Sequence, residues 1–170
     1  MKIFLTVFAL TFPLLAQRNY PPNIPTAQKY LYKTVGDTKL HLYAFMPKGW
    51  REEDKRPAVI FFFGGGWNSG SPEQFVPQCK HLAAKGLIAM TADYRVKSRH
   101  GTTAKACVAD ARDAMIWVRE NATKLGIATD RLAAGGGSAG GHIAACLGCI
   151  DPPKKEIFSS RPNALFLFNP

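Results

Sequence analysis

Two kinds of hydrophobic pattern alternate along this chain. Short, nearly uninterrupted apolar runs are typical of strands that are covered on both faces of a sheet. The predicted strands are 29–35, 39–46, 58–63, 87–94, 132–134 and 164–168, the last as a buried core strand. Helical spacing or alanine-rich composition predicts helices at 72–85, from Thr102 or Thr103 to about 125, and directly after Ser138. This alternation predicts an α/β fold with a mostly parallel central sheet and helices on both faces.

The N-terminal end of the chain has a different pattern. Residues 1–16 carry a positive charge at Lys2, followed by a 13-residue apolar stretch at 3–15. This stretch is short for a membrane span and typical of a secretory signal. A buried N-terminal strand or helix is the alternative. Residues 17–27 contain three prolines and are expected to be an extended linker. The domain would then occupy residues 28–170, and we expect the protein to be secreted or periplasmic.

The net charge of +10 would suit a nucleic-acid or membrane partner if the basic residues were clustered. They are dispersed instead, and the largest groups are short loop clusters such as Lys97–His100 and 154–155. Because a nucleic-acid site needs its basic residues on one face, we expect an ordinary solvated surface. The prediction is no nucleic-acid partner and no stable membrane anchor after signal cleavage, with the oligomeric state left open.

Four cysteines permit disulfides in an exported chain, although their pairing is not predictable from sequence. They are Cys79, Cys107, Cys146 and Cys149. The pair Cys146-x-x-Cys149 suggests a zinc or redox site, but it falls on the predicted helix after Ser138 and no second ligand pair exists. We expect small packing residues there, and neither a metal nor a cofactor.

The clearest chemical motif is Gly136-Gly137-Ser138-Ala139-Gly140, a match to the G-x-S-x-G nucleophile elbow. The apolar run 132–134 leads into it, and the alanine-rich segment follows at once. A serine hydroxyl is a weak nucleophile, so it must be held exposed on a tight turn where a base can reach it. Small neighbours are needed because strand and helix pass close together there. Ser138 is therefore the candidate nucleophile.

A second glycine-rich turn, Gly64–Gly66, follows the predicted strand 58–63. The carboxyl ends of parallel strands share one edge of the sheet, where ligands bind, so we expect this turn to lie beside Ser138. Its backbone N–H groups can hold the oxyanion that forms when the serine attacks an acyl carbon. The spacing Gly135-x-Gly137-x-x-Gly140 also fits a dinucleotide fingerprint, but that pattern alone is weak. Glu156 lies in a loop and not at the end of the next strand, where the ribose-binding acid belongs.

Four segments carry a resemblance to the α/β-hydrolase esterases and lipases of the HGGG, or hormone-sensitive-lipase-like, type: GGGSAGGHIAA, FFGGGWNSGSPEQF, TADYR and DARDAMIWVRENATKLGIATDRLAAGGGSAGG. The chain looks most like secreted bacterial members grouped with acetyl-xylan or feruloyl carbohydrate esterases, from about Tyr30 to its last residue. The resemblance implies that Ser138 is the nucleophile and that Trp67 walls the acyl or alcohol pocket. It also implies an oxyanion hole formed by the N–H groups of Gly65, Gly66 and Ala139.

The sequence departs from the HGGG pattern at Phe63, which stands where the family has a histidine that braces the oxyanion loop. This departure questions the rigidity of the loop but not its N–H donors. A second departure concerns the acid and the base, which in this fold follow the serine. After Ser138 the chain offers only His142, Asp151 and Glu156. We expect His142 to pack within the elbow helix and Asp151 to be a turn residue.

No other residue supplies an evident base. His41, His81 and His100 precede the serine, and Asp93 is expected to belong to a structural turn after its strand. A sheet that ended at the apolar strand 164–168 would also expose an unpaired edge, which folded proteins avoid. We therefore expect the 170 residues to be the N-terminal part of a longer enzyme that carries its acid and histidine elsewhere.

The expected function of the intact protein is hydrolysis of a small-molecule or carbohydrate ester through an acyl-enzyme on Ser138. Two alternatives stay open. One is a serine peptidase of the prolyl-oligopeptidase kind, although its elbow more often has an aromatic residue where Ala139 stands. The other is an inactive fragment or pseudoenzyme that lacks the acid and the base.

Overall fold

The computed structural model describes residues 20–152 and 156–170, so the predicted signal at 1–16 lies outside the described residues. The strands are β1 (Gln28–Val35), β2 (Thr38–Phe45), β3 (Arg56–Phe62), β4 (Ile88–Ala92), β5 (Ile127–Gly137) and β6 (Ala164–Phe168). The α-helices are α1 (Val76–Ala84), α2 (Lys97–His100), α3 (Ala104–Glu120), α4 (Ala122–Leu125) and α5 (Ala139–Cys149). Two 3-10 turns are η1 (Glu52–Asp54) and η2 (Pro72–Phe75).

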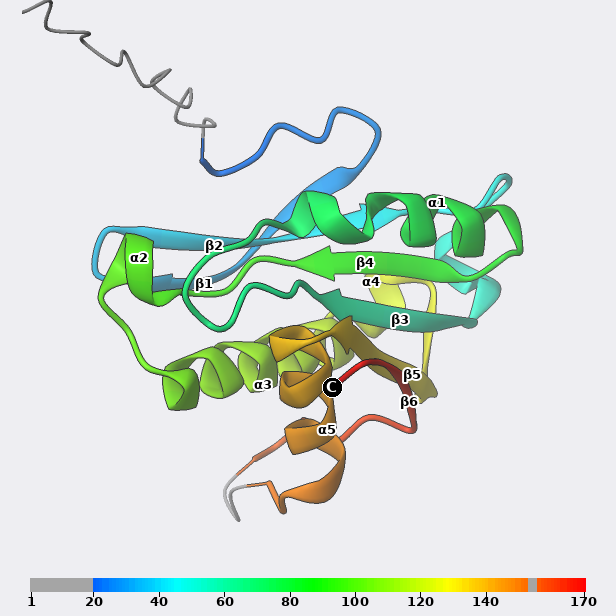
Figure 1. Cartoon of the computed structure of the whole chain (residues 1–170). Helices are drawn as coiled ribbons and strands as arrows, with labels where there is room; N and C mark the ends of the chain where they lie inside the picture. The colour runs from blue at the N-terminus through cyan, green and yellow to red at the C-terminus, as the bar shows by residue number, and fades with distance from the viewer. Residues whose placement is uncertain (1–19, 153–155) are drawn as a thin grey trace, which may run out of the picture.

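These strands form one sheet in the order β1-β2-β4-β3-β5-β6. β1 and β2 make an antiparallel hairpin, and β2 is also antiparallel to β4. β4, β3, β5 and β6 run parallel to one another. α1 covers one face of the sheet, while α3 and α5 pack together on the other (Figure 1). The predicted fold class, a mostly parallel sheet with helices on both faces, is confirmed.

The centre of the sheet holds the core. Every residue of β4 is buried, as is the second half of β3. On the α1 face, Phe61 stacks on Phe75 with ring centroids 4.9 Å apart. On the opposite face, α3 buries the apolar positions that its sequence spacing predicts: Cys107, Ala111, Ala114, Met115 and Val118. Removal of this apolar surface from water is the main force that holds the layers together.

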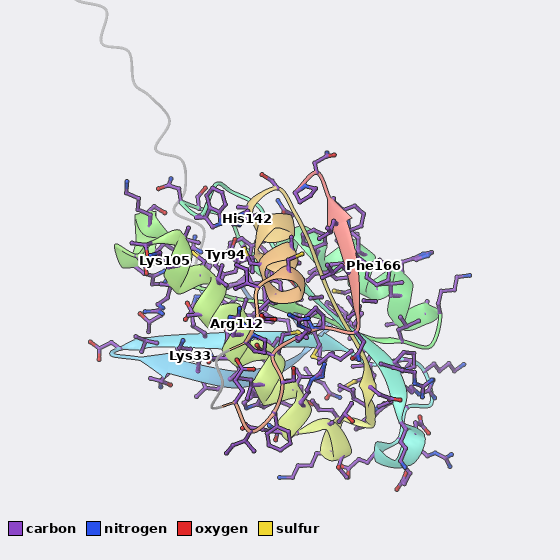
Figure 2. The ribbon with its side chains drawn as sticks, turned by 90° about the horizontal axis from the view of Figure 1, so that it is seen from below. Lys33, Tyr94, Lys105, Arg112, His142 and Phe166 are labelled. Atoms are coloured by element: carbon purple, nitrogen blue, oxygen red, sulfur yellow. The ribbon has the colours of Figure 1, made fainter. Side chains whose placement is uncertain are left out.

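A buried carboxylate ties the hairpin to the helical layer. Asp110 of α3 is fully buried and accepts hydrogen bonds from Lys33 of β1 (2.7 Å) and from the Arg95 guanidinium (2.8 Å). Figure 2 shows Lys33 reaching from the hairpin toward α3. Because the carboxylate has two cationic partners, its burial is compensated. The hairpin and the segment after β4 are thereby fixed to the same helix.

The elements differ from the sequence prediction at several places, and the helix predicted to reach about 125 is divided into α3 and α4 at Asn121. β5 begins five residues before position 132, because polar, exposed residues at 129–131 continue the strand without an apolar pattern. The predicted helix at 72–85 opens with the 3-10 turn η2 before α1 begins. The segment after the predicted strand 87–94, for which no helix was expected, contains the single helical turn α2, closed by Gly101 in the left-handed region at φ +60°. One turn of helix is too short to leave a periodic signal.

β6 forms where it was predicted and pairs with β5, but the expectation that it is buried is wrong in this structure. All five of its residues are exposed, and Phe168 has 48% of its surface accessible. β6 is the outer strand of the sheet, and no described element covers its outer side. A shallow apolar groove therefore runs between Phe61, His81 and Leu82 on one side and Phe166 and Phe168 on the other.

The described cysteines are all free thiols. Cys79 and Cys107 are buried, as packing residues are. Cys146 is only partly covered and Cys149 is exposed, so the packing role expected for this pair is wrong for Cys149. The cause is its place in the last turn of α5, where the helix leaves the sheet.

Candidate functional site

Ser138 occupies the turn between β5 and α5. Its backbone angles, φ +51° and ψ −122°, lie in a region that residues with a side chain rarely adopt. The residue is exposed at the carboxyl edge of the sheet, where the sequence places it. Its N–H donates to the carbonyl of Phe168 (2.9 Å), and its own carbonyl accepts from the N–H of His142 (2.9 Å). The turn is therefore fixed from both sides while the side chain stays accessible.

Two glycines make this turn possible. A Cβ on Gly140 would lie 1.9 Å from the carbonyl oxygen of Phe62, and one on Gly136 would lie 2.4 Å from the same oxygen. Neither distance is possible for real atoms, so α5 approaches the end of β3 only because these positions lack side chains. The small residues that flank the serine are thus explained by close packing.

The glycine-rich loop after β3 lies against the elbow. A Cβ on Gly64 would be 2.8 Å from the carbonyl oxygen of Gly137 and 3.4 Å from Cβ of Ser138. Among the described residues, the N–H groups of Gly65 and Gly66 donate to no acceptor. The N–H of Ala139 belongs to the first turn of α5, where helices leave such groups unpaired. The structure therefore brings the loop that carries Gly65 and Gly66 to the serine.

Contacts from distant segments hold this loop in place. Gly64 N–H donates to Gln74 Oε1 (2.5 Å), and the Tyr94 hydroxyl donates to the carbonyl of Phe63 (2.6 Å). The ring of Phe63 is fully buried and stacks on that of Tyr94, with centroids 4.0 Å apart. The N–H groups of Asn68 and Ser69 both donate to the carbonyl of Gly65 (3.0 and 3.1 Å). The loop is thus braced without a histidine at position 63.

Trp67 and His142 form an aromatic pair beside Ser138. Their ring centroids are 5.2 Å apart at an interplanar angle of 86°. Trp67 has φ +58°, and its buried indole Nε1 has no partner among the described residues. His142 lies one turn into α5 (Figure 2) and is exposed. Its Nδ1 comes within 3.7 Å of the Cys146 sulfur. His142 does pack, as expected, but its partner is the Trp67 ring at the surface. The imidazole is not buried between the helices and the sheet.

The remaining candidate acids and bases lie elsewhere. Asp151 is exposed and pairs with Arg161 (2.7 Å), while Glu156 accepts hydrogen bonds from Ser160. Within the described ranges, no histidine or carboxylate hydrogen-bonds to the Ser138 hydroxyl, and no three potential ligands gather as a metal site. None of the described helices is long and apolar enough to cross a membrane.

Sequence reasoning missed the environment of Asp93. This residue follows β4 and is completely buried, and its Oδ2 has no partner among the described residues. Burial raises the pKa of its carboxyl to about 7, although the hydrogen bond from Tyr20 and the charge of Arg99 act in the opposite direction. Only its position in the polar end of TADYR, directly after a buried strand, signals that a carboxylate enters the interior.

Comparison with known proteins places this chain in a family. The sequence profile of the BD-FAE family matches residues 42–161. Carboxylesterase NlhH of Mycobacterium tuberculosis is 30% identical over 161 residues, covering 86% of this chain and 49% of NlhH. Esterase LipC of the same species is 36% identical over 104 residues, covering 58% of this chain and 25% of LipC. The chain spans about half the length of NlhH.

Solved structures agree with the sequence relatives. Esterase 2 of Thermogutta terrifontis, phosphonylated by cyclosarin, has a TM-score of 0.85 and 47% identity, covering 91% of this chain and 60% of that one. Its butyrate-bound form has a TM-score of 0.84 and 49% identity, covering 89% of this chain and 56% of that one. The chain belongs to the BD-FAE family of hormone-sensitive-lipase-like α/β-hydrolases, whose relatives here are carboxylesterases.

Proposed function

We propose that the intact protein hydrolyses carboxylic esters through an acyl-enzyme on Ser138. The observation that carries the proposal is the exposed serine on a strained turn, directly beside a loop whose N–H groups are unpaired. Attack of Ser138 Oγ on an ester carbonyl forms a tetrahedral intermediate, and the N–H groups of Gly65, Gly66 and Ala139 would hold its oxyanion. Collapse expels the alcohol, and water then releases the acid.

The neighbours support this chemistry. Esterase 2 of T. terrifontis is phosphorylated by paraoxon in one structure and bound to propionate in another. Organophosphates react with activated nucleophiles, and propionate and butyrate are short acyl products. We therefore propose short-chain acyl esters as the substrate class. Acetyl groups on plant polysaccharide belong to this class and feruloyl groups are the bulkier candidate; Trp67 would wall the pocket for either.

The serine proton needs an acceptor. Because no described histidine hydrogen-bonds to the Ser138 hydroxyl, we propose that the general base and its carboxylate partner belong to a part of the protein outside the 170 residues. The longer relatives support this assignment. Comparison of ester turnover by the 170-residue chain and by the intact gene product tests it, and equal rates would refute it. We also propose secretion or export to the periplasm, tested by fractionation.

The nucleophile is tested by labelling. Paraoxon should transfer its diethyl phosphoryl group to Ser138 Oγ of the intact protein and release 4-nitrophenolate, with the added mass on the peptide that contains Ser138. Ser138→Ala should abolish labelling and lower p-nitrophenyl acetate hydrolysis by at least about a thousandfold. Ser159→Ala, at an exposed loop serine, is the matched control. Retained hydrolysis in Ser138→Ala would show that another residue is the nucleophile.

A further inference from the structure

Residues 20–25, here called the N-terminal strap, pack on the sheet without forming a helix or strand. Ile24 is only 8% exposed and Pro22 is buried, so the strap adds apolar surface to the core. The Tyr43 hydroxyl of β2 donates to the carbonyl of Pro22 (3.1 Å). The strap is thus part of the folded domain, although its composition is that of a linker.

Tyr20 at the start of the strap contacts polar side chains from two other segments. Its hydroxyl donates to the carboxylate of Asp93, and the Arg99 guanidinium lies over its ring, 3.8 Å from the centroid. The ring of His100 meets it edge-on at 6.4 Å. One side chain therefore contacts both the residue that follows β4 and the helix α2.

Part of the polar surroundings of Tyr20 is buried. Asp93 Oδ2 and the Nε and Nη2 of Arg99 are buried without a partner among the described residues. The Tyr32 hydroxyl donates to the carbonyl of Asp93 (2.6 Å). The titratable and charged groups that act on Asp93 from the surrounding elements are Tyr20, Tyr32, Tyr43, Tyr94, Arg99 and Asp110. Burying polar groups without partners lowers the stability of the fold. Because Tyr20 contacts both Asp93 and Arg99, its side chain helps to hold the segment 93–99 in place.

The other side of the same segment supports the glycine-rich loop. The N–H of Lys97 donates to the carbonyl of Trp67 (2.9 Å), and that of Ser98 to the carbonyl of Asn68 (3.0 Å). Both donors belong to α2, which also carries Arg99. A chain of direct contacts therefore runs from Tyr20 through Arg99 and α2 to the loop that holds Gly65 and Gly66.

We propose that Tyr20 is a positioning residue for the oxyanion loop, acting through Arg99, Asp93 and α2. This inference rests on the proposed function for its kinetic consequence, but not for its structural one. An oxyanion hole acts on the transition state and adds little to substrate binding. Loss of Tyr20 should therefore lower kcat while KM stays nearly constant. A displacement of a fraction of an ångström at such a site is expected to cost about tenfold in rate.

The test measures amide hydrogen exchange and kinetics in the intact protein. Tyr20→Ala should speed exchange in the peptide that covers 64–70 and reduce kcat for p-nitrophenyl acetate about tenfold. Tyr20→Phe keeps the ring under Arg99 and should restore most of both properties. Tyr30→Ala is the matched control, because Tyr30 packs on Trp117 and hydrogen-bonds to Gln28, away from α2; it should change neither property.

The outcomes separate the two proposals. Unchanged exchange at 64–70 in Tyr20→Ala overturns the positioning role. Faster exchange at 64–70 in a protein that hydrolyses no ester leaves the positioning role standing and overturns the proposed function. If Tyr20→Ala unfolds the whole domain, Tyr20→Phe decides: a slight increase in exchange confined to 64–70 supports the proposal, and exchange raised equally throughout the domain overturns it.

Discussion

The two loops that meet at Ser138 are held by different physical means. The elbow at 135–141 depends mainly on its own glycines, which allow α5 to touch β3 while the serine takes up the strained turn between them. It also has a distant support, a backbone hydrogen bond from the Ser138 N–H to the Phe168 carbonyl. The glycine-rich loop at 64–70 is fixed by side chains from elsewhere, above all Gln74 and Tyr94. The elbow should therefore tolerate few local substitutions, whereas the loop should respond to changes made far from it in sequence.

The largest expected effect tests the steric basis of the elbow. Gly140→Ala would bring a Cβ to 1.9 Å from the Phe62 carbonyl oxygen, which only a backbone shift relieves. We expect a loss of about 3 kcal/mol or more in the free energy of unfolding, measured by urea denaturation.

Gly148→Ala on the same helix is the matched control. Its Cβ would meet only the tip of the exposed Leu165 side chain at 2.8 Å, which can rotate away. This variant should be neutral, or gain up to about 1 kcal/mol from helix propensity. Equal destabilisation by the two substitutions would contradict the steric account of the elbow.

The next largest effect concerns pH, because the supports of the loop include a titratable group and those of the elbow do not. The pKa of Asp93 is about 7 in the folded protein and near 4 when unfolded. Between these values the folded state binds the extra proton, so this group makes the free energy of unfolding fall as the pH rises.

Asp93→Asn removes this titration and keeps an oxygen for the Tyr20 hydroxyl. Compared with the wild type, the variant should lose less stability between pH 4 and pH 7, by up to about 3 kcal/mol across that window. Urea denaturation at several pH values measures it. Identical pH slopes in the two proteins would show that Asp93 does not titrate in this range.

A smaller effect is expected at Tyr94, which braces the loop from the segment just after β4. Tyr94→Phe keeps the stack on Phe63 but removes the hydroxyl that donates to the Phe63 carbonyl (2.6 Å). We expect a loss of about 1–2 kcal/mol and faster amide exchange at 64–70, with exchange at 135–141 unchanged. Trp50→Phe, which removes an indole hydrogen bond to Leu125, should leave the loop unaffected. If Tyr94→Phe raised the amide exchange rate equally at 64–70 and at 135–141, the two loops would not be held by different means.

The smallest expected effect is at Gln74, whose side chain is exposed and whose place water can partly take. Gln74→Leu removes the acceptor of the Gly64 N–H and should cost no more than about 1 kcal/mol. Turnover of p-nitrophenyl acetate by the intact protein should still fall a few-fold, because the loop loses a direct brace. Gln78→Leu, one helical turn later in α1, is the control. If turnover fell equally in Gln74→Leu and Gln78→Leu, the loss would come from a new apolar side chain on this surface and not from the hydrogen bond to Gly64.

Features set by interactions between residues close in sequence were predicted correctly, and features set by contacts between distant residues were not. The strand at 58–63, the elbow helix and the mostly parallel direction of the strands were predictable, because apolar periodicity and close-packing glycines act locally. The short helix α2 was not, since a single turn is stabilised mainly by its contacts with Trp67 and Asn68. The exposure of Phe166 and Phe168 was not predicted either. The sequence of an apolar strand is the same whether or not another element covers that strand.

Phe63 shows the same limit at the candidate site. Read along the sequence, a phenylalanine in place of the histidine of the HGGG pattern puts the rigidity of the loop in question. In the structure, the same ring stacks on Tyr94, 31 positions away, and that tyrosine braces the loop through its hydroxyl.

The sequence by itself determined the tight turn at Ser138 between β5 and α5, because the glycines and the serine that form it are neighbours and their backbone requirements are local. Only the tertiary structure decided what holds the opposing loop. Its supports come from positions between 10 and 31 residues away, and through α2 from Tyr20, 73 positions before the buried Asp93 that it contacts. Contacts across such separations form only after the sheet has brought its strand ends together, so no local pattern records them.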